Sequence, residues 1–270
     1  MAIQSDVSAG TGQPAELVQV ARAGAIAEIA LNAGPLNLVT RPLLRDLNAA
    51  ATRLAAEPTV RCVILHGGTA RAFCAGSDIK EFAHLREDAS EQKILFEDMV
   101  LRNLARLPMP TIAAIDGPAL GGGLELALAC DLRVVRAGVT LGLTESRLGG
   151  LAGSGSVRLA RLIGPGRAKE LLFTGEAISA EQALDWGIVN RVSADRTALD
   201  VARGLAAVIA ERGPLSNRLA KSLVDAALDE PLDAALTRST VAQQAIFESE
   251  DLREGMHAFF GKRPPRFKDG

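Results

Sequence analysis

Short apolar runs of strand length alternate with amphipathic segments over most of this chain. The runs 17–20 and 25–31 flank a turn that contains Gly24, and this pattern predicts a β-hairpin. Further apolar runs of strand length predict the remaining strands, at residues 60–65, 111–115, 132–135, 140–144 and 189–192.

Segments with a helical apolar period lie between and after these runs. Thr40 is a candidate N-cap, with Pro42 near the first position, of a helix that ends before Pro58. Residues 86–93 are polar, and we expect an exposed segment there before a helix that runs to Leu107. From Val157 the pattern becomes mostly helical, with segments at 157–162, 167–172 and 180–185.

Beyond Asp195 the pattern is that of amphipathic helices only, at 199–211, 215–228, 232–249 and 252–260. Helices with apolar stripes and little core of their own usually pack on a partner. We therefore expect three regions: a loose tail over residues 1–14, a core with the functional site over 15–195, and a helical oligomerisation region over 196–270.

Composition narrows the classes of function. The net charge of -2 and the lack of basic helices leave no basic face for nucleic acid, so a non-enzymatic RNA-binding role is the remotest alternative. There is no Tyr, which excludes tyrosine-based chemistry. Cys62, Cys74 and Cys130 are scattered, which indicates a reducing compartment and argues against disulfides. The three His residues form no ligand pattern, so we expect no metal.

The chain begins without the basic segment and apolar stretch of a secretory signal, and no uncharged apolar run reaches membrane-spanning length. We therefore expect a soluble, cytoplasmic protein with no membrane partner.

The clearest candidate chemistry lies in residues 116–131, DGPALGGGLELALACD, read as the end of a strand, a glycine turn and a helix. Three consecutive glycines let the backbone approach a ligand closely and leave the first N–H groups of the helix free to face a polarised oxygen. Glu125 falls in the first helical turn. Its carboxylate is either an acid/base or a surface group that stabilises the helix dipole by roughly 0.3–1 kcal/mol. The G-x-G-x-x-G pattern of dinucleotide sites is not matched, because Leu126 stands at the last position.

A second strand–turn–helix junction lies at residues 73–82, FCAGSDIKEF. The helix leaves the N–H of Ser77 unpaired, and Ser77 or Asp78 is a candidate N-cap; taken alone, this is an ordinary capped turn. A helix over 121–130 spans about 15 Å at roughly 1.5 Å per residue. The returning strand over 140–144 spans about 16 Å at roughly 3.3 Å each. The chain can therefore bring Glu145 back to Glu125.

Taken together, three stretches resemble the crotonase superfamily, and most closely its enoyl-CoA hydratases: 73–82, 116–131 and 173–192, FTGEAISAEQALDWGIVNRV. The resemblance extends from about residue 17 to residue 268. It implies an α/β fold, a spiral of ββα repeats followed by a C-terminal helical trimerisation region, and assembly as a homotrimer or homohexamer.

The resemblance also implies site residues. The thioester carbonyl of an acyl-CoA substrate would lie between the backbone N–H groups of Ser77 and Gly122, which match the oxyanion hole of the family. Glu125 and Glu145 match its two catalytic glutamates. Further substrate-binding positions are Ala75, Asp78, Ile79 and Lys80. No separate cofactor is implied, because CoA is part of the substrate.

The basic tail over residues 262–268, KRPPRFK, is a second candidate for CoA binding, because family members pack their C-terminal helices near CoA sites. Lys262 and Lys268 are candidate phosphate contacts, with Arg263 and Arg266 as equal alternatives. The candidates for contact with the adenine are Phe259, Phe260 and Phe267.

The activity that the resemblance implies is hydration of a trans-2-enoyl-CoA to a 3-hydroxyacyl-CoA, as in fatty-acid catabolism. The nearest alternative is a 3,2-enoyl-CoA isomerase, and another crotonase-type acyl-CoA reaction is a further alternative. Isomerases of the family usually keep only the second glutamate, so Glu125 favours a hydratase. Two departures from the family pattern leave the acyl preference open: LAGSGS at 151–156 lacks a common proline, and the loop NAGPLN at 32–37 falls near the expected CoA position.

Overall fold

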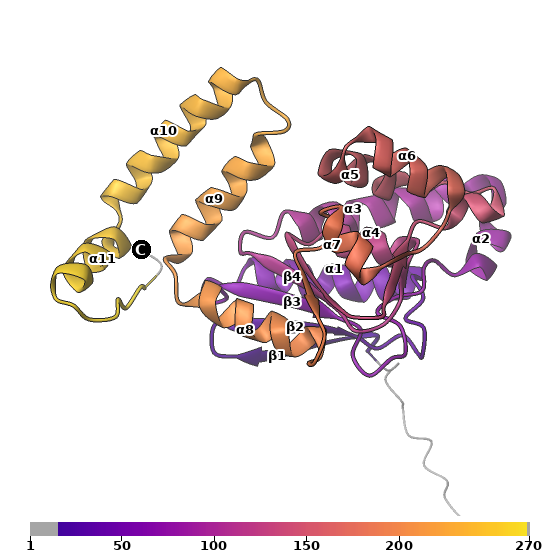
Figure 1. Cartoon of the computed structure of the whole chain (residues 1–270), viewed down its shortest axis with the longest axis horizontal. Helices are drawn as coiled ribbons and strands as arrows, with labels where there is room; N and C mark the ends of the chain where they lie inside the picture. The colour runs from indigo at the N-terminus through magenta and orange to yellow at the C-terminus, as the bar shows by residue number, and fades with distance from the viewer. Residues whose placement is uncertain (1–15, 269–270) are drawn as a thin grey trace, which may run out of the picture.

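The computed structural model describes residues 16–268, so the tail expected at residues 1–14 lies outside the described residues. A six-stranded sheet forms its centre (Figure 1). In spatial order the strands are β1 (Val18–Ala23), β2 (Ile26–Leu31), β3 (Cys62–His66), β4 (Thr111–Ile115), β6 (Leu132–Arg136) and β9 (Arg191–Ser193). The predicted hairpin is confirmed, since β1 and β2 pair antiparallel. All the other pairs in this sheet are parallel.

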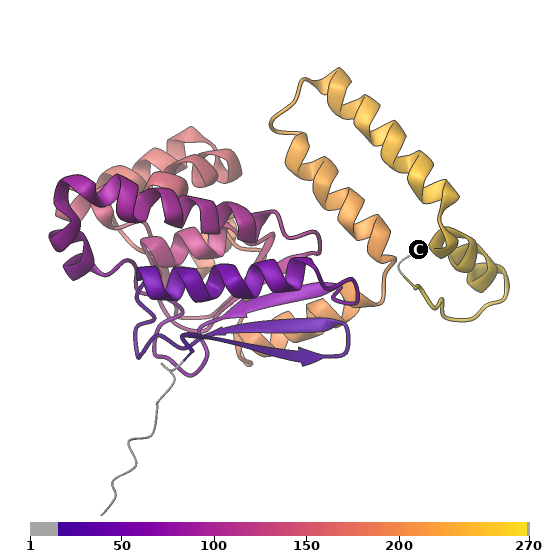
Figure 2. The ribbon, with the colours of Figure 1, turned by 180° about the vertical axis from the view of Figure 1, so that it is seen from behind.

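Helices cover both faces of this sheet (Figures 1 and 2). One face carries α1 (Arg41–Ala55), α3 (Leu95–Ala105) and α4 (Gly122–Leu128), which share the larger apolar core with the sheet. Thr40 caps α1 as predicted, because its hydroxyl accepts a hydrogen bond from the Leu43 N–H at 3.3 Å. The other face carries α8 (Ala198–Ala210), whose alanines pack on buried residues of β3, β4 and β6.

A smaller sheet lies beside the glycine turn at residues 121–123, because the Gly121 N–H donates to the carbonyl of Gly142 at the end of β7 (Thr140–Gly142). The sheet consists of β5 (Ala119–Leu120), β7 and β8 (Ile178–Ser179). The short 3-10 helix η3 (Glu145–Leu148) follows β7, and α5 (Gly153–Ile163), α6 (Pro165–Thr174) and α7 (Ala180–Asp185) complete this side of the molecule.

Three C-terminal helices extend away from the body as an arm (Figures 1 and 2). They are α9 (Pro214–Ala226), α10 (Leu232–Glu248) and α11 (Glu250–Phe260). Large apolar side chains are exposed along the arm, among them Val224, Leu228, Leu232, Val241 and Phe247. The arm fits the expected oligomerisation region, which remains a prediction. The predicted boundary at residue 195 assigns α8 to the oligomerisation region. In the structure α8 packs on the main sheet and is not part of the arm.

Two segments differ from their predicted form. Residues 86–93 were expected to form an exposed segment, and Glu87, Asp88 and residues 90–92 are exposed. The segment is nevertheless helical, since it continues α2 (Ile79–Leu85) as a 3-10 turn, η1 (Arg86–Asp88), and a π-turn, η2 (Ser90–Ile94). Within this segment Lys93 is fully buried, because its ammonium group finds polar partners inside the fold. The stretch 151–156 also differs from a loop, since α5 begins at Gly153.

No helix among residues 16–268 combines the length and the apolar character needed to cross a membrane.

Candidate active site

The two glycine turns of the sequence lie against each other at backbone contact. Cys74 and Ala119 form an isolated parallel bridge, and the Leu120 N–H donates to the Cys74 carbonyl at 3.1 Å. A Cβ on Gly123 would lie only 2.0 Å from that carbonyl oxygen, so only glycine fits there. Gly76 has φ of 107° and faces the Leu120 carbonyl, 3.1 Å from where its own Cβ would stand. Both glycines therefore bring the turns together.

This packing leaves the N–H groups of Ser77 and Gly122 without an acceptor anywhere in residues 16–268. A Cβ on Gly76 would lie 3.9 Å from the Gly122 nitrogen, and one on Gly122 would lie 3.1 Å from the Ser77 hydroxyl oxygen. The two junctions therefore meet. Unpaired N–H groups at such a junction can stabilise negative charge on a substrate oxygen.

Glu125 is buried next to this junction, with 8% of the residue exposed. It lies in the first turn of α4, and its Oε1 accepts a hydrogen bond from the Gly155 N–H at 2.6 Å. The pKa of Glu125 is raised to about 7, chiefly by burial and to a smaller extent by the nearby carboxylates of Glu97 and Glu145, while the hydrogen bond from the Gly155 N–H opposes the shift. A carboxyl group that titrates near neutrality is suited to general acid–base chemistry.

Glu145 reaches the same glycine turn from η3. Its Oε1 lies 2.9 Å from the point where a Cβ on Gly121 would stand. Its Oε2 is buried and has no hydrogen-bond partner among the described residues. Burial also raises the pKa of Glu145. The structure thus brings Glu145 and Glu125 into one site, as the lengths of the intervening helix and strand allow.

A hollow of about 450 Å³ opens beside Glu145, and most of its wall is apolar. It is lined by Leu143, Glu145, Ser146, Gly150, Leu151, Ala152, Ser156, Leu172 and Phe173. Gly155 sets the position of α5 on this side. A Cβ there would lie 2.9 Å from both methyl groups of Leu143 and 3.1 Å from the Cγ of Glu125.

A family model described as enoyl-CoA hydratase/isomerase matches residues 21–270. The chain belongs to this enoyl-CoA hydratase/isomerase family. It is 36% identical over 241 residues to the mitochondrial methylglutaconyl-CoA hydratase of Mus musculus, an alignment that covers 86% of this chain and 76% of the relative. It is 38% identical over 245 residues to the enoyl-CoA isomerase/hydratase fer4 of Mycosarcoma maydis, covering 86% of this chain and 88% of that protein.

Solved structures of the enoyl-CoA hydratase/isomerase family share the fold. The crystal structure of an enoyl-CoA hydratase from Bacillus anthracis matches with a TM-score of 0.90 at 37% identity, covering 94% of this chain and 100% of that one. The predicted crotonase-like α/β fold with C-terminal helices is therefore confirmed.

The other predicted substrate-binding residues lie on the same turn as Ser77. The Ala75 N–H donates to the Leu36 carbonyl at 2.9 Å, and Asp78 accepts from the Lys80 N–H at 2.9 Å. Ile79 is 62% exposed, and Lys80 is exposed as well. These residues lie on the turn that carries Ser77, and their roles in substrate binding remain predictions.

A buried asparagine, missed by the sequence analysis, holds the loop at 32–37 against this turn. Asn37 is fully buried with φ of 47°, and its amide nitrogen donates to the carbonyls of Gly67 at 2.9 Å and Phe73 at 3.1 Å. Its amide oxygen accepts from the Ala33 N–H at 2.9 Å. These hydrogen bonds therefore hold the loop at 32–37 against the turn that carries Ser77.

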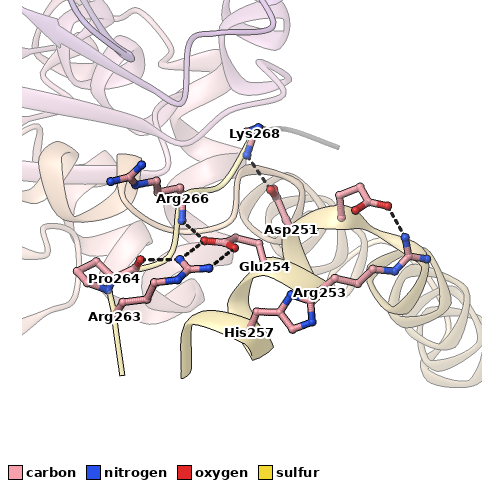
Figure 3. Close-up of a pocket in the computed structure, with 9 residues that line it drawn as sticks. Asp251, Arg253, Glu254, His257, Arg263, Pro264, Arg266 and Lys268 are labelled. Atoms are coloured by element: carbon pink, nitrogen blue, oxygen red, sulfur yellow. Dashed lines mark hydrogen bonds and ion pairs between the residues drawn. The ribbon is translucent and has the colours of Figure 1, made fainter. Parts of the chain in front are cut away.

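The basic tail folds back on α11, far from the two turns of its own chain (Figure 1). Arg263 forms a two-pronged ion pair with Glu254, at 2.6 and 2.7 Å. The Arg266 N–H donates to Glu254 at 2.7 Å, and the Lys268 N–H donates to Asp251 at 2.8 Å (Figure 3). The ammonium groups of Lys262 and Lys268 are not needed for this docking, because backbone groups and Arg263 provide it.

Proposed function

We propose that this chain adds water to a trans-2-enoyl-CoA and so forms a 3-hydroxyacyl-CoA, reversibly. The observation that carries the proposal is the meeting of two carboxyl groups, that of the buried Glu125 and that of the half-buried Glu145, beside the two unpaired N–H groups of Ser77 and Gly122. Membership in the enoyl-CoA hydratase/isomerase family supports an acyl-CoA hydratase or isomerase activity. Free, buried thiols at Cys62, Cys74 and Cys130 support a reducing, cytoplasmic location.

In this proposal the Ser77 and Gly122 N–H groups hold the thioester oxygen and stabilise the enolate that forms on it. The Glu125 carboxylate takes a proton from water as the water oxygen bonds to Cβ. The Glu145 carboxylic acid then gives its proton to Cα, which completes the addition of one water. The pKa of each group is raised, which supports a site in which one carboxyl group holds a proton while the other is ionised.

The rival activity, 3,2-enoyl-CoA isomerisation, moves one proton between two carbons and needs only one carboxylate. A second carboxylate is needed to activate water. In a pure isomerase Glu125 would have no role in the reaction. Because burial of a carboxyl group is unfavourable to folding, its presence in the site favours hydration.

Hydration of a chain-length series, from crotonyl-CoA to hexadecenoyl-CoA, tests the proposal. We expect loss of the enoyl absorbance and formation of 3-hydroxyacyl-CoA, with a preference for some chain lengths. The same enzyme should be assayed with 3-enoyl-CoA thioesters. Conversion of these to 2-enoyl-CoA, without hydration of any member of the series, would replace the hydratase proposal by the isomerase.

The position of the tail bears on assembly. Because the tail lies far from the turns of its own chain, contact with CoA requires the site of another copy, as in the proposed homotrimer or homohexamer. We propose that Lys262 and Lys268 contribute positive charge to the CoA phosphates of such a neighbouring site.

Removal of these charges is expected to weaken binding of the nucleotide part of CoA. The double variant K262Q/K268Q keeps the Arg263–Glu254 ion pair and the backbone docking of the tail. We expect KM for enoyl-CoA to rise about tenfold or more. The KM for the matching pantetheine thioester, which lacks the nucleotide, should change little. Equal changes in KM for both thioesters would indicate that the tail serves oligomer assembly and not CoA binding. Truncation after Gly261, followed by measurement of the oligomeric state, would then verify this role.

A further inference from the structure

Glu97 provides a third carboxyl group at the site. It lies on α3 and is 9% exposed. Its Oε1 lies 3.5 Å from the point where a Cβ on Gly122 would stand, and the Ser77 hydroxyl oxygen lies 3.1 Å from the same point. Glu97 therefore faces the junction that carries the two unpaired N–H groups. The proposed hydration mechanism gives it no task.

The Glu97 side chain forms no hydrogen bond or ion pair within residues 16–268. Lys93 stands four residues before it, a spacing that normally favours an ion pair in a helix. The Lys93 ammonium instead donates to the Val39 carbonyl at 3.0 Å and to Glu81 at 2.6 Å. The cation that could pair with Glu97 is thus engaged elsewhere.

A π-turn leads from Lys93 into α3, the helix that carries Glu97. The Leu95 N–H donates to the Ser90 carbonyl five residues earlier, at the start of α3. Such π-turns interrupt helices frequently at functional sites.

A largely buried carboxyl group without a protein partner loses most of its hydration, and a ligand that pairs with it restores a hydrogen bond. An unbranched hydrocarbon acyl chain would leave Glu97 unpaired, whereas a hydroxyl or carbonyl oxygen would bond to it. Burial raises the pKa of Glu97, and the nearby Lys93 charge opposes this shift. The carboxylate form accepts a hydrogen bond from a hydroxyl group, and the protonated form both donates and accepts. A carboxylate on the acyl group fits less well, because Glu125 and Glu145 are close and Lys93 is already paired.

We propose that Glu97 is a specificity-determining residue, whose carboxyl group hydrogen-bonds an uncharged oxygen, a hydroxyl or a carbonyl, on the acyl group of the substrate. This inference rests on the proposed acyl-CoA function and deepens it, since it names a class of oxygenated acyl groups.

The test compares trans-2-hexenoyl-CoA with its analogues that carry a hydroxyl group at C4, C5 or C6. The wild-type enzyme should have a higher kcat/KM for one of the hydroxylated thioesters than for the plain one. In E97L this ratio should fall by about 10- to 100-fold, while E97Q, which keeps a donor and an acceptor, should stay within about threefold of wild type. D98N on the same helix is the matched control, because Asp98 pairs with Arg102 at 2.7 Å, and its ratio should not change.

Two results would overturn the proposal. The first is an unchanged ratio in E97L, including the case in which E97L and E97Q lose activity equally on both thioesters, as expected of an acid/base. The second is a wild-type enzyme with no preference for any hydroxylated thioester.

Binding of saturated hexanoyl-CoA and of its hydroxylated analogues, measured by calorimetry, separates this inference from the proposed reaction. The Kd of the preferred hydroxylated compound should rise in E97L by the same 10- to 100-fold. A preserved binding preference without any hydration would reject the hydratase proposal alone. Equal binding of plain and hydroxylated compounds by the wild type would reject the role of Glu97 alone.

Discussion

Glu125→Gln is expected to abolish hydration of trans-2-enoyl-CoA, with a loss of at least about 10²–10⁴-fold in kcat. Glutamine keeps the size of the side chain and can still accept a hydrogen bond from the Gly155 N–H, so the fold of the site should persist. It cannot take a proton from water. Glu145 remains, and exchange of the α-proton of a saturated acyl-CoA with deuterated solvent should therefore survive in this variant. The loss of enoyl absorbance and mass spectrometry measure the two reactions separately.

Glu145→Gln should lose both reactions, because the Cα proton then has no donor or acceptor. Glu170→Gln, an exposed position on α6, is the matched control and should behave like wild type. A Glu125→Gln enzyme that hydrates at close to the wild-type rate would contradict the two-carboxylate mechanism.

Gly122→Pro is expected to lower kcat by about 10²–10³-fold, since it removes one of the two N–H groups that face the substrate oxygen. The first position of α4 accepts proline in its backbone conformation, so the helix itself should form. A side chain at this position is tight, however, with the Ser77 hydroxyl 3.1 Å and Val39 3.4 Å from its Cβ. Steady-state kinetics with thermal unfolding as a check on folding measures the effect.

Gly122→Ala separates the lost N–H from the added Cβ, because alanine keeps the donor. It should retain much more activity than Gly122→Pro. Ser77→Ala also keeps its backbone N–H and should retain most activity. A severe defect in Ser77→Ala would instead make its hydroxyl group a participant in the reaction, and equal defects in both Gly122 variants would show that space and not the N–H matters there.

Local patterns were sufficient to predict most elements of this fold. The hairpin β1–β2, the Thr40 cap of α1 and the buried strands β3 and β4 follow from apolar period, turn residues and capping residues that lie close together in the sequence. The oxyanion-hole residues and both glutamates came from the resemblance, and the glycine turns supplied an independent reason for free N–H groups.

Features that depend on distant partners were not predicted. Lys93 was expected to be exposed with the rest of its polar segment, because its partners Glu81 and Val39 are recognised only in the fold. Glu97 had a signal that was overlooked: it lies on the apolar stripe of α3 with Val100, Leu101 and Leu104. A carboxylate at that spacing, among buried residues, indicates a site.

The start of α5 shows the same limitation in another form. Gly153, Ser154 and Gly155 have the composition of a loop, and glycine is unfavourable inside helices. In the structure they form the first turn of a helix, where the Gly155 N–H needs an acceptor outside the helix and finds Glu125. The sequence contains both residues but not their contact across thirty positions.

The burial of Glu125 sets stability against activity in this protein. Between about pH 4.5 and 7 the folded chain holds a proton on Glu125 that the unfolded chain has released, so the free energy of unfolding falls as the pH rises through this window. The shift from 4.5 to about 7 corresponds to a loss on the order of 3 kcal/mol at and above the upper end. Apolar replacements of the buried carboxyl groups would relieve this loss. A mutant library of this protein selected at pH 8 for heat resistance alone would therefore accumulate variants that are thermostable but inactive. Enzyme engineering would have to select for turnover at every round.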